Sequence, residues 1–160
     1  MKDAGRPRRI LVAEDDRALR RLIEMLLRND DVDVLTVGDG AGALAVFDDF
    51  APDALVCDVM MPKLSGFTVC RDLRIAWGAR LPIILLTARC FDEDIQTLLE
   101  LGGITFIINK PFHARQLMSA IGSVIRTAHG DLHDLAPAAL PEPFGWLTPA
   151  QVRPTLVSPE

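Results

Sequence analysis

The sequence is poor in cysteine and has no long apolar segment. Its three cysteines, Cys57, Cys70 and Cys90, show no Cys-x-x-Cys spacing. An odd number of thiols in apolar surroundings is typical of reduced core cysteines in a cytoplasmic protein. No window approaches the roughly 20 apolar residues that cross a bilayer. We therefore expect a cytoplasmic chain with no membrane partner.

The sequence also has no excess of basic residues. Its 17 lysines and arginines against 22 aspartates and glutamates give a net charge of −5. Because such a chain is a poor general ligand for nucleic acid, we expect no nucleic-acid binding by this chain alone. The basic N-terminus precedes only four apolar residues, too few for a signal peptide. We interpret residues 1–8 as a leader and expect Arg6, Arg8 and Arg9 to be solvated.

Apolar runs alternate with helical patterns along residues 9–128. We expect strands over about 10–13, 32–37, 54–58, 82–86 and 104–108, and helices over about 18–27, 41–50, 67–77, 92–101 and 113–126. Asp16 is the expected cap of the first helix. Strict alternation requires a parallel sheet with helices on both faces, so we predict one doubly wound α/β domain with five strands.

Residues 129–160 differ in composition from the rest of the chain. Six prolines fall in this segment, and its apolar residues have no sustained periodicity. This composition predicts an extended or partly disordered tail. Phe144, Trp146 and Leu147 could attach part of the tail either to the domain or to a partner, and the sequence leaves both alternatives open.

Polar side chains stand where the predicted strands end. Glu14 and Asp15 follow the first strand, Asp58 ends the third, Thr87 follows the fourth and Lys110 follows the fifth. Because the carboxyl ends of parallel strands share one edge of the sheet, we expect these side chains to lie close together.

Three carboxylates beside one lysine repel one another unless a cation joins them. Mg²⁺ prefers oxygen ligands and commonly takes one or two carboxylates together with a phosphate oxygen. The Thr87 hydroxyl and the Lys110 ammonium group can hold phosphate oxygens, so the set suits phosphoryl transfer to a carboxylate. Asp58 is the expected acceptor because its strand lies between those of the acidic pair and of Thr87.

Together these motifs resemble the receiver domain of two-component response regulators, similar to the chemotaxis regulators. The carriers are Val12-Ala13-Glu14-Asp15-Asp16, the segment 56–62 with Gly66, Leu86-Thr87-Ala88, and Asn109-Lys110-Pro111-Phe112. The resemblance covers residue 9 to about residue 128. It implies a flavodoxin-like fold whose five parallel strands have the order 2-1-3-4-5.

The resemblance also implies roles for the acidic residues. Asp58 would accept a phosphoryl group from the phosphohistidine of a histidine kinase or phosphotransfer protein, giving a 4-aspartylphosphate. Asp15, Asp58 and the backbone carbonyl of Met60 would bind Mg²⁺ directly, and Glu14 would act through water. This chemistry makes the chain a member of a phosphorelay and not an enzyme.

Further implications concern the fifth strand. Thr87 and Lys110 would contact the phosphate and act as the switch, and the Lys110-Pro111 bond would be cis. The family usually places a switch aromatic three residues before the lysine. Here that residue is Ile107, while Phe106 stands four residues before. Either the last strand has one extra residue, or the aromatic is absent.

The expected output is a protein contact through the last two helices and the last strand, either with an unidentified protein or as a homodimer. Two other functions fit parts of the sequence. Residues 147–149 look like the opening of a helix-turn-helix domain, but only eleven residues follow, so a DNA-binding regulator requires a longer chain. An aspartyl-phosphate phosphatase commonly has an aspartate two residues after the nucleophile, where this chain has Met60.

Overall fold

The computed structural model of the chain describes residues 6–77, 81–88, 97, 104–127 and 146–147. The strands are β1 (Arg8–Ala13), β2 (Val32–Val37), β3 (Ala54–Asp58), β4 (Ile83–Thr87), β5 (Ile104–Asn109) and β6 (Trp146–Leu147). The helices are α1 (Arg17–Leu27), α2 (Gly40–Phe50), α3 (Gly66–Trp77) and α5 (Ala114–Thr127). Of the helix predicted over 92–101, only residue 97 is described, and it is helical; Cys90 lies outside the described residues.

The strands form a single sheet in the order β2-β1-β3-β4-β5-β6. The first five are parallel, which confirms the predicted fold class and strand order. The sixth strand was not predicted. It runs antiparallel to β5, with Leu147 opposite Ile107 and Trp146 opposite Ile108. These two tail residues therefore attach to the domain itself, which decides between the two alternatives for them.

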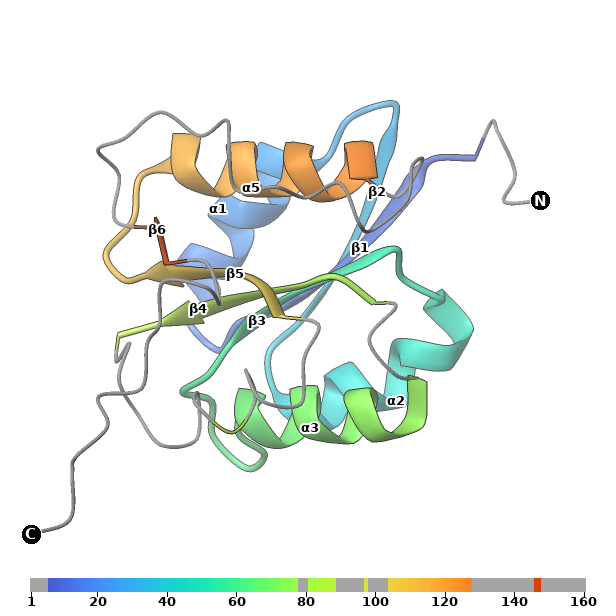
Figure 1. Cartoon of the computed structure of the whole chain (residues 1–160), viewed down its shortest axis with the longest axis vertical. Coiled ribbons are helices and arrows are strands. Elements are labelled where there is room, and N and C mark those ends of the chain that lie inside the picture. Colours follow the sequence, from blue (N-terminus) through green and yellow to red (C-terminus); the bar gives the residue numbers. More distant parts are fainter. Residues whose placement is uncertain (1–5, 78–80, 89–96, 98–103, 128–145, 148–160) are drawn as a thin grey trace, which may run out of the picture.

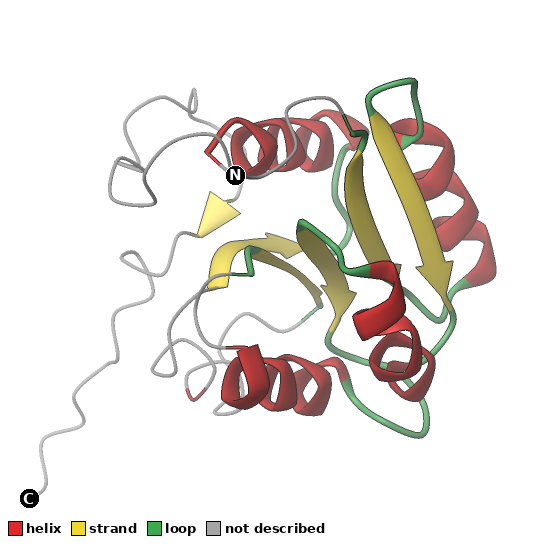
Figure 2. Ribbon diagram, turned by 90° about the vertical axis from the view of Figure 1, so that its right-hand side faces the viewer, coloured by secondary structure: helices red, strands yellow, loops and turns green. Residues whose placement is uncertain are grey.

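Helices cover both faces of the sheet, with α1 and α5 on one side and α2 and α3 on the other (Figures 1 and 2). Successive strand residues point to opposite faces. In β1, Ile10 and Val12 pack in the cluster beneath α1 and α5, while Leu11 and Ala13 pack in the cluster beneath α2 and α3. Burial on both faces explains why the strands read as continuous apolar runs.

Carboxylates cap two of the helices. Asp16 accepts a hydrogen bond from the backbone N–H of Leu19 at 2.9 Å, which confirms its predicted role as the cap of α1. Asp39 caps α2 in the same way, with a 2.7 Å bond from the N–H of Gly42. This bond, together with Lys63, lowers the pKa of Asp39. No helix among the described segments is long and apolar enough to span a bilayer.

The prediction of solvated arginines near the N-terminus was wrong. Asp53, which directly precedes β3, binds both Arg6 and Arg9. Its carboxylate pairs with the Arg6 guanidinium at 2.9 Å and also accepts the backbone N–H of Arg9 at 2.9 Å. The Arg9 side chain donates to the carbonyl of Phe50 at 3.0 Å. Arg8 belongs to β1, which starts two residues before the predicted strand because β2 continues the ladder as far as Val32.

Candidate functional site

The predicted polar residues gather at the carboxyl edge of the sheet. Glu14 directly follows β1, Asp58 is the last residue of β3, Thr87 is the last of β4, and Lys110 directly follows β5. Because the four strands are parallel neighbours, this edge receives all of their ends. The sequence prediction that these segments meet at one place is correct.

Lys110 joins two of the carboxylates. Its Nζ lies 2.9 Å from Glu14 Oε2 and 2.9 Å from Asp58 Oδ2. The second oxygen of each carboxylate accepts a backbone N–H: Glu14 Oε1 from Asp16 at 3.1 Å, and Asp58 Oδ1 from Met60 at 3.1 Å. Both carboxylates are buried, so these four bonds satisfy groups that would otherwise be costly to remove from water.

Asp15 completes an acidic trio. Glu14, Asp15 and Asp58 can each offer one carboxylate oxygen, and these oxygens all lie within 4.8 Å of one another. Asp15 is exposed while the other two are buried. Three hard oxygen donors of this kind, one of them facing solvent, fit a divalent cation such as Mg²⁺ that keeps part of its water shell.

The electrostatics of the trio also favour a cation. The pKa of Glu14 is raised to about 7, mainly by burial; the hydrogen bond from Lys110 lowers this pKa, and the nearby charge of Asp58 raises it. Burial alone would lower the pKa of Lys110, but its bonds to Glu14 and Asp58 outweigh burial and raise it. One ammonium group thus stands against three carboxylates, which leaves an excess of negative charge for a metal ion to neutralise.

The loop after Asp58 is shaped around the backbone of that residue. The N–H of Gly66 donates to the carbonyl of Val59 at 3.0 Å. A Cβ on Gly66 would overlap the carbonyl oxygen of Asp58, so any side chain at residue 66 would displace the end of β3. This contact explains physically why residue 66 is a glycine. Met60, in the same loop, is 56% exposed.

Thr87 lies next to Asp58 on the neighbouring strand. Asp58 pairs with Leu86 in the ladder between β3 and β4, which puts Thr87 one residue further towards the edge. Thr87 is fully buried. Its carbonyl accepts the backbone N–H of Lys110 at 2.8 Å, so it also helps to fix the start of the lysine loop. The Lys110-Pro111 peptide bond is cis, in agreement with the expectation from the resemblance.

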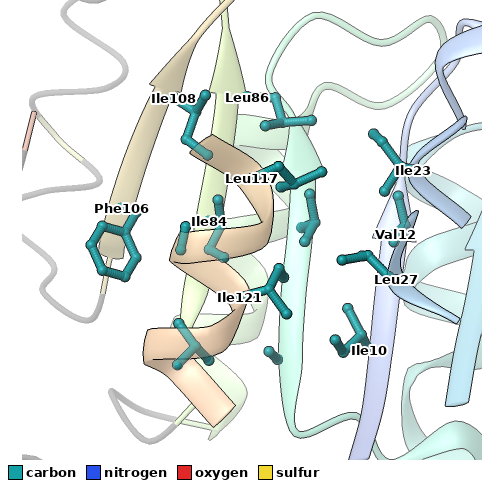
Figure 3. Packing of buried hydrophobic residues seen from close by; sticks show 14 of the residues in the cluster. Ile10, Val12, Ile23, Leu27, Ile84, Leu86, Phe106, Ile108, Leu117 and Ile121 are labelled. Atoms are coloured by element: carbon teal, nitrogen blue, oxygen red, sulfur yellow. The ribbon is translucent and has the colours of Figure 1, made fainter. Parts of the chain in front are cut away.

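The two residues considered for the switch aromatic lie on opposite faces of the sheet. Phe106 packs in the cluster beneath α1 and α5, together with Leu117 and Ile121 of α5 (Figure 3). Ile107 packs in the cluster beneath α2 and α3. By strand alternation, Ile107 shares its face with Thr87, since Ile107 pairs with Leu85 two residues before Thr87.

β5 does contain one extra residue, but it lies before both candidates. Ile83 pairs with Ile104 and Ile84 pairs with Phe106, so Thr105 has no counterpart on β4. From Phe106 to Asn109 the register is regular. The irregularity therefore leaves Ile107 three residues before Lys110, and an aliphatic side chain stands where the family usually has an aromatic one.

Arg20 was not among the predicted site residues. Its Nη1 donates to the carbonyl of Glu14 at 2.7 Å and approaches the carbonyl of Asp15 at 3.4 Å. In a single sequence, an arginine on the polar side of a helix looks like any solvated residue, so no pattern could have singled it out.

Comparisons with known proteins agree with this geometry. The chain is 42% identical over 118 residues to the probable transcriptional regulator ycf27 of Porphyridium aerugineum, covering 74% of this chain and 48% of that protein. It is 36% identical over 118 residues to the DNA-binding response regulator MtrA of Mycolicibacterium paratuberculosis, covering 74% and 51%. The chain thus spans about half the length of the curated relatives it matches.

A solved structure gives the same result. The receiver domain of the Francisella response regulator 1452 superposes with a TM-score of 0.65 at 28% identity, covering 75% of this chain and 98% of that domain. The response regulator receiver domain family matches residues 10–122, which is most of the chain. With the parallel five-strand order and the acidic trio beside Lys110, these matches show that the chain belongs to the family of two-component response regulator receiver domains.

Proposed function

We propose that Asp58 is the phosphoacceptor of this receiver and that it takes its phosphoryl group from a histidine kinase or phosphotransfer protein. The observation that carries the proposal is the shared contact of Lys110 Nζ with Glu14 and Asp58, 2.9 Å from each, beside the exposed carboxylate of Asp15. This transfer needs a nucleophilic carboxylate, here Asp58, acidic residues that bind a cation, here Glu14 and Asp15, and a fixed ammonium group, here that of Lys110.

In the proposed reaction, an oxygen of Asp58 forms a bond to phosphorus. The P–N bond to the donor histidine breaks, and its electron pair stays on the imidazole nitrogen. Lys110 Nζ already stands 2.9 Å from Asp58 Oδ2 and is placed to hold a phosphoryl oxygen there. The Thr87 hydroxyl, one residue beyond Asp58 on the next strand, is the proposed second contact to the phosphoryl group.

Mg²⁺ is the proposed cofactor. Asp15, Asp58 and the backbone carbonyl of Met60 would be direct ligands, and Glu14 would act through water. When bound, the ion neutralises the repulsion between the incoming phosphoryl group and the carboxylates. Glu14 and Asp58 each hold one oxygen against a backbone N–H, which keeps both carboxylates oriented before any metal arrives.

The proposed role is that of a switch and not of a phosphatase. Two residues after Asp58 the chain has Met60, and a thioether cannot donate or accept a proton as a second aspartate would. The relatives are named as regulators, which agrees with this reading. We propose that residues 9–128 form the receiver domain, between segments 1–8 and 129–160, with Arg8 and the two residues of β6 added to its sheet from these segments.

The proposed output surface includes β5 and α5, as expected from the sequence, together with the segment 92–101. Within the described part of this surface, β6 already pairs with β5. A homodimer or another protein would bind there. A DNA-binding output is the second candidate, because MtrA is named a DNA-binding response regulator and matches along half of its length. The mass of the protein in its source cells distinguishes a stand-alone receiver from a longer regulator.

The test is phosphorylation of the purified chain by acetyl phosphate. We expect one phosphoryl group per chain by intact mass in the presence of Mg²⁺, none in excess EDTA, and none in Asp58→Asn with Mg²⁺. Asp48→Asn, the same change on an exposed aspartate of α2, should behave as wild type. Equal labelling with and without Mg²⁺, or labelling of Asp58→Asn, would contradict the proposal.

A further inference from the structure

We infer that Arg20 is a positioning residue for the acidic pair, because it holds the backbone of residues 14–16 and so sets where the carboxylates of Glu14 and Asp15 stand for a divalent cation. The inference rests on the proposed function, since it assumes that these carboxylates serve a metal site. It adds a residue from α1 to a site otherwise built from strand ends and the loops after them.

Three successive carbonyl groups accept hydrogen bonds from this one residue. Arg20 Nη1 donates to the Glu14 carbonyl at 2.7 Å and to the Asp15 carbonyl at 3.4 Å, and the backbone N–H of Arg20 donates to the Asp16 carbonyl at 2.8 Å. β1 pairs with its neighbours only as far as Ala13. Beyond that point the sheet offers the Glu14 and Asp15 carbonyls no ladder, and the Arg20 guanidinium supplies the donor instead. The bond to the Asp16 carbonyl is the first backbone bond of α1.

The neighbouring strand leaves room for the guanidinium group. Gly38 directly follows β2, and a Cβ built there would lie 2.9 Å from Arg20 Nη1 and 3.4 Å from its Cζ. The backbone N–H of Glu14 donates to the carbonyl of Val37 at 3.1 Å. Glu14 is thus held at its N–H by the end of β2 and at its carbonyl by a guanidinium that rests against the next residue, Gly38.

Arg20 and Lys110 act on the acidic residues in different ways. Lys110 bonds to carboxylate oxygens of Glu14 and Asp58, which are the atoms that a metal ion or phosphoryl group would need. The bonds of the Arg20 guanidinium go to main-chain carbonyl oxygens instead. Arg20 can therefore keep its contacts when a cation binds, because its guanidinium occupies no ligand atom. Its positive charge by itself opposes a second cation, so the inferred effect of Arg20 on the metal site is one of position.

Four variants of the full chain separate position from charge. Arg20→Gln removes the charge and the Nη1 atom that donates to both carbonyls. Arg20→Lys keeps the charge but replaces the guanidinium with an ammonium group on a side chain of different shape. Gly38→Ala leaves the net charge unchanged and displaces the guanidinium, because the overlapping atoms belong to the end of a flexible side chain. Arg21→Gln is the matched control, since it removes the same charge from an exposed position of the same helix.

The readouts are the affinity for MgCl₂ alone, by isothermal titration calorimetry, and the urea midpoint in EDTA, which reports folding. We expect Arg20→Gln to weaken Mg²⁺ binding by about tenfold or more, and Arg20→Lys and Gly38→Ala to weaken it by smaller factors. Arg21→Gln should stay within about twofold of wild type, since exposed charges are largely screened. With acetyl phosphate, Arg20→Gln should need more Mg²⁺ for half-maximal labelling but reach the same plateau rate.

Several results would overturn the inference. If Arg20→Gln and Arg21→Gln have the same affinity for Mg²⁺, the position of the Arg20 guanidinium has no role, because loss of a positive charge alone would strengthen the binding of a cation and not weaken it. If Arg20→Lys and Gly38→Ala both bind as wild type does, the hydrogen-bonding geometry has no role, and these two variants decide the question should Arg20→Gln fail to fold. If wild type itself binds no Mg²⁺, the proposed function falls and takes this inference with it, a result distinct from failure of the Arg20 variants alone.

Discussion

Replacing Glu14 by glutamine should stabilise the metal-free protein at alkaline pH. Burial raises the pKa of Glu14 from 4.5 to about 7. Between these values the folded protein keeps a proton that the unfolded chain releases, so stability falls as the pH rises from 4.5 to 7, and the whole cost is present above pH 7. A difference of about 7 minus 4.5, at about 1.4 kcal/mol per pH unit, makes this cost on the order of 3 kcal/mol.

Glutamine removes the buried charge but not every contact. The two oxygens of Glu14 accept from Asp16 N–H and from Lys110 Nζ. The single amide oxygen of glutamine replaces one of these bonds, and losing the other costs about 1 kcal/mol. We therefore expect Glu14→Gln to be more stable than wild type by about 2 kcal/mol at pH 8 without metal.

Urea denaturation in EDTA at pH 5 and pH 8 measures the effect. From pH 5 to pH 8, the free energy of unfolding of wild type should fall by roughly 2 to 3 kcal/mol relative to that of Glu14→Gln. Glu24→Gln, the same chemical change at the surface ion pair with Arg28, is the matched control and should follow wild type. If wild type and Glu14→Gln have the same dependence on pH, the reasoning about the buried carboxylate is refuted.

Three further perturbations test other contacts. Gly66→Ala should lower the free energy of unfolding in urea by at least about 2 kcal/mol, because the added Cβ meets the backbone of Asp58. The control, Gly42→Ala in α2, should be nearly neutral, because its Cβ would meet the nearest atom at 3.3 Å. Lys110→Ala leaves two buried carboxylates without their cation, so it should lower the free energy of unfolding by about 3 kcal/mol in EDTA near neutral pH. Mg²⁺ should restore part of this stability. An unchanged urea midpoint would count against the ion pairs. The pKa of Lys110 is raised above 10.5, so its contribution is complete below pH 10.5 and disappears as the pH rises through the folded value. Proline at both 146 and 147 removes the N–H groups of β6 and should speed amide exchange in β5, and equal exchange rates would contradict the pairing.

Much of the fold could be predicted because a strand that is buried on both faces has a continuous run of apolar residues in the sequence. The run at 54–57 is apolar throughout, and its strand is sandwiched between helix layers. The meeting of Glu14, Asp58 and Lys110 follows from the parallel arrangement of the strand ends. The order of the strands came from the resemblance to receiver domains and not from the spacing of apolar residues.

The features that were missed depend on contacts between distant residues. The position of Arg6 depends on Asp53, 47 residues away, and no local pattern connects them. β6 consists of two residues, too short to show strand alternation against a proline-rich background. The sequence left two explanations for the missing switch aromatic, and only the register of β4 and β5 shows that the extra residue lies before Phe106.

Locating the modified residue tests the central claim most directly. An acyl phosphate on aspartate can be reduced with borohydride to homoserine, and tandem mass spectrometry then identifies the altered position. After treatment with acetyl phosphate and Mg²⁺, we predict homoserine at Asp58 and aspartate unchanged at Asp15. Homoserine at Asp15 or at another carboxylate, with Asp58 intact, would contradict the account.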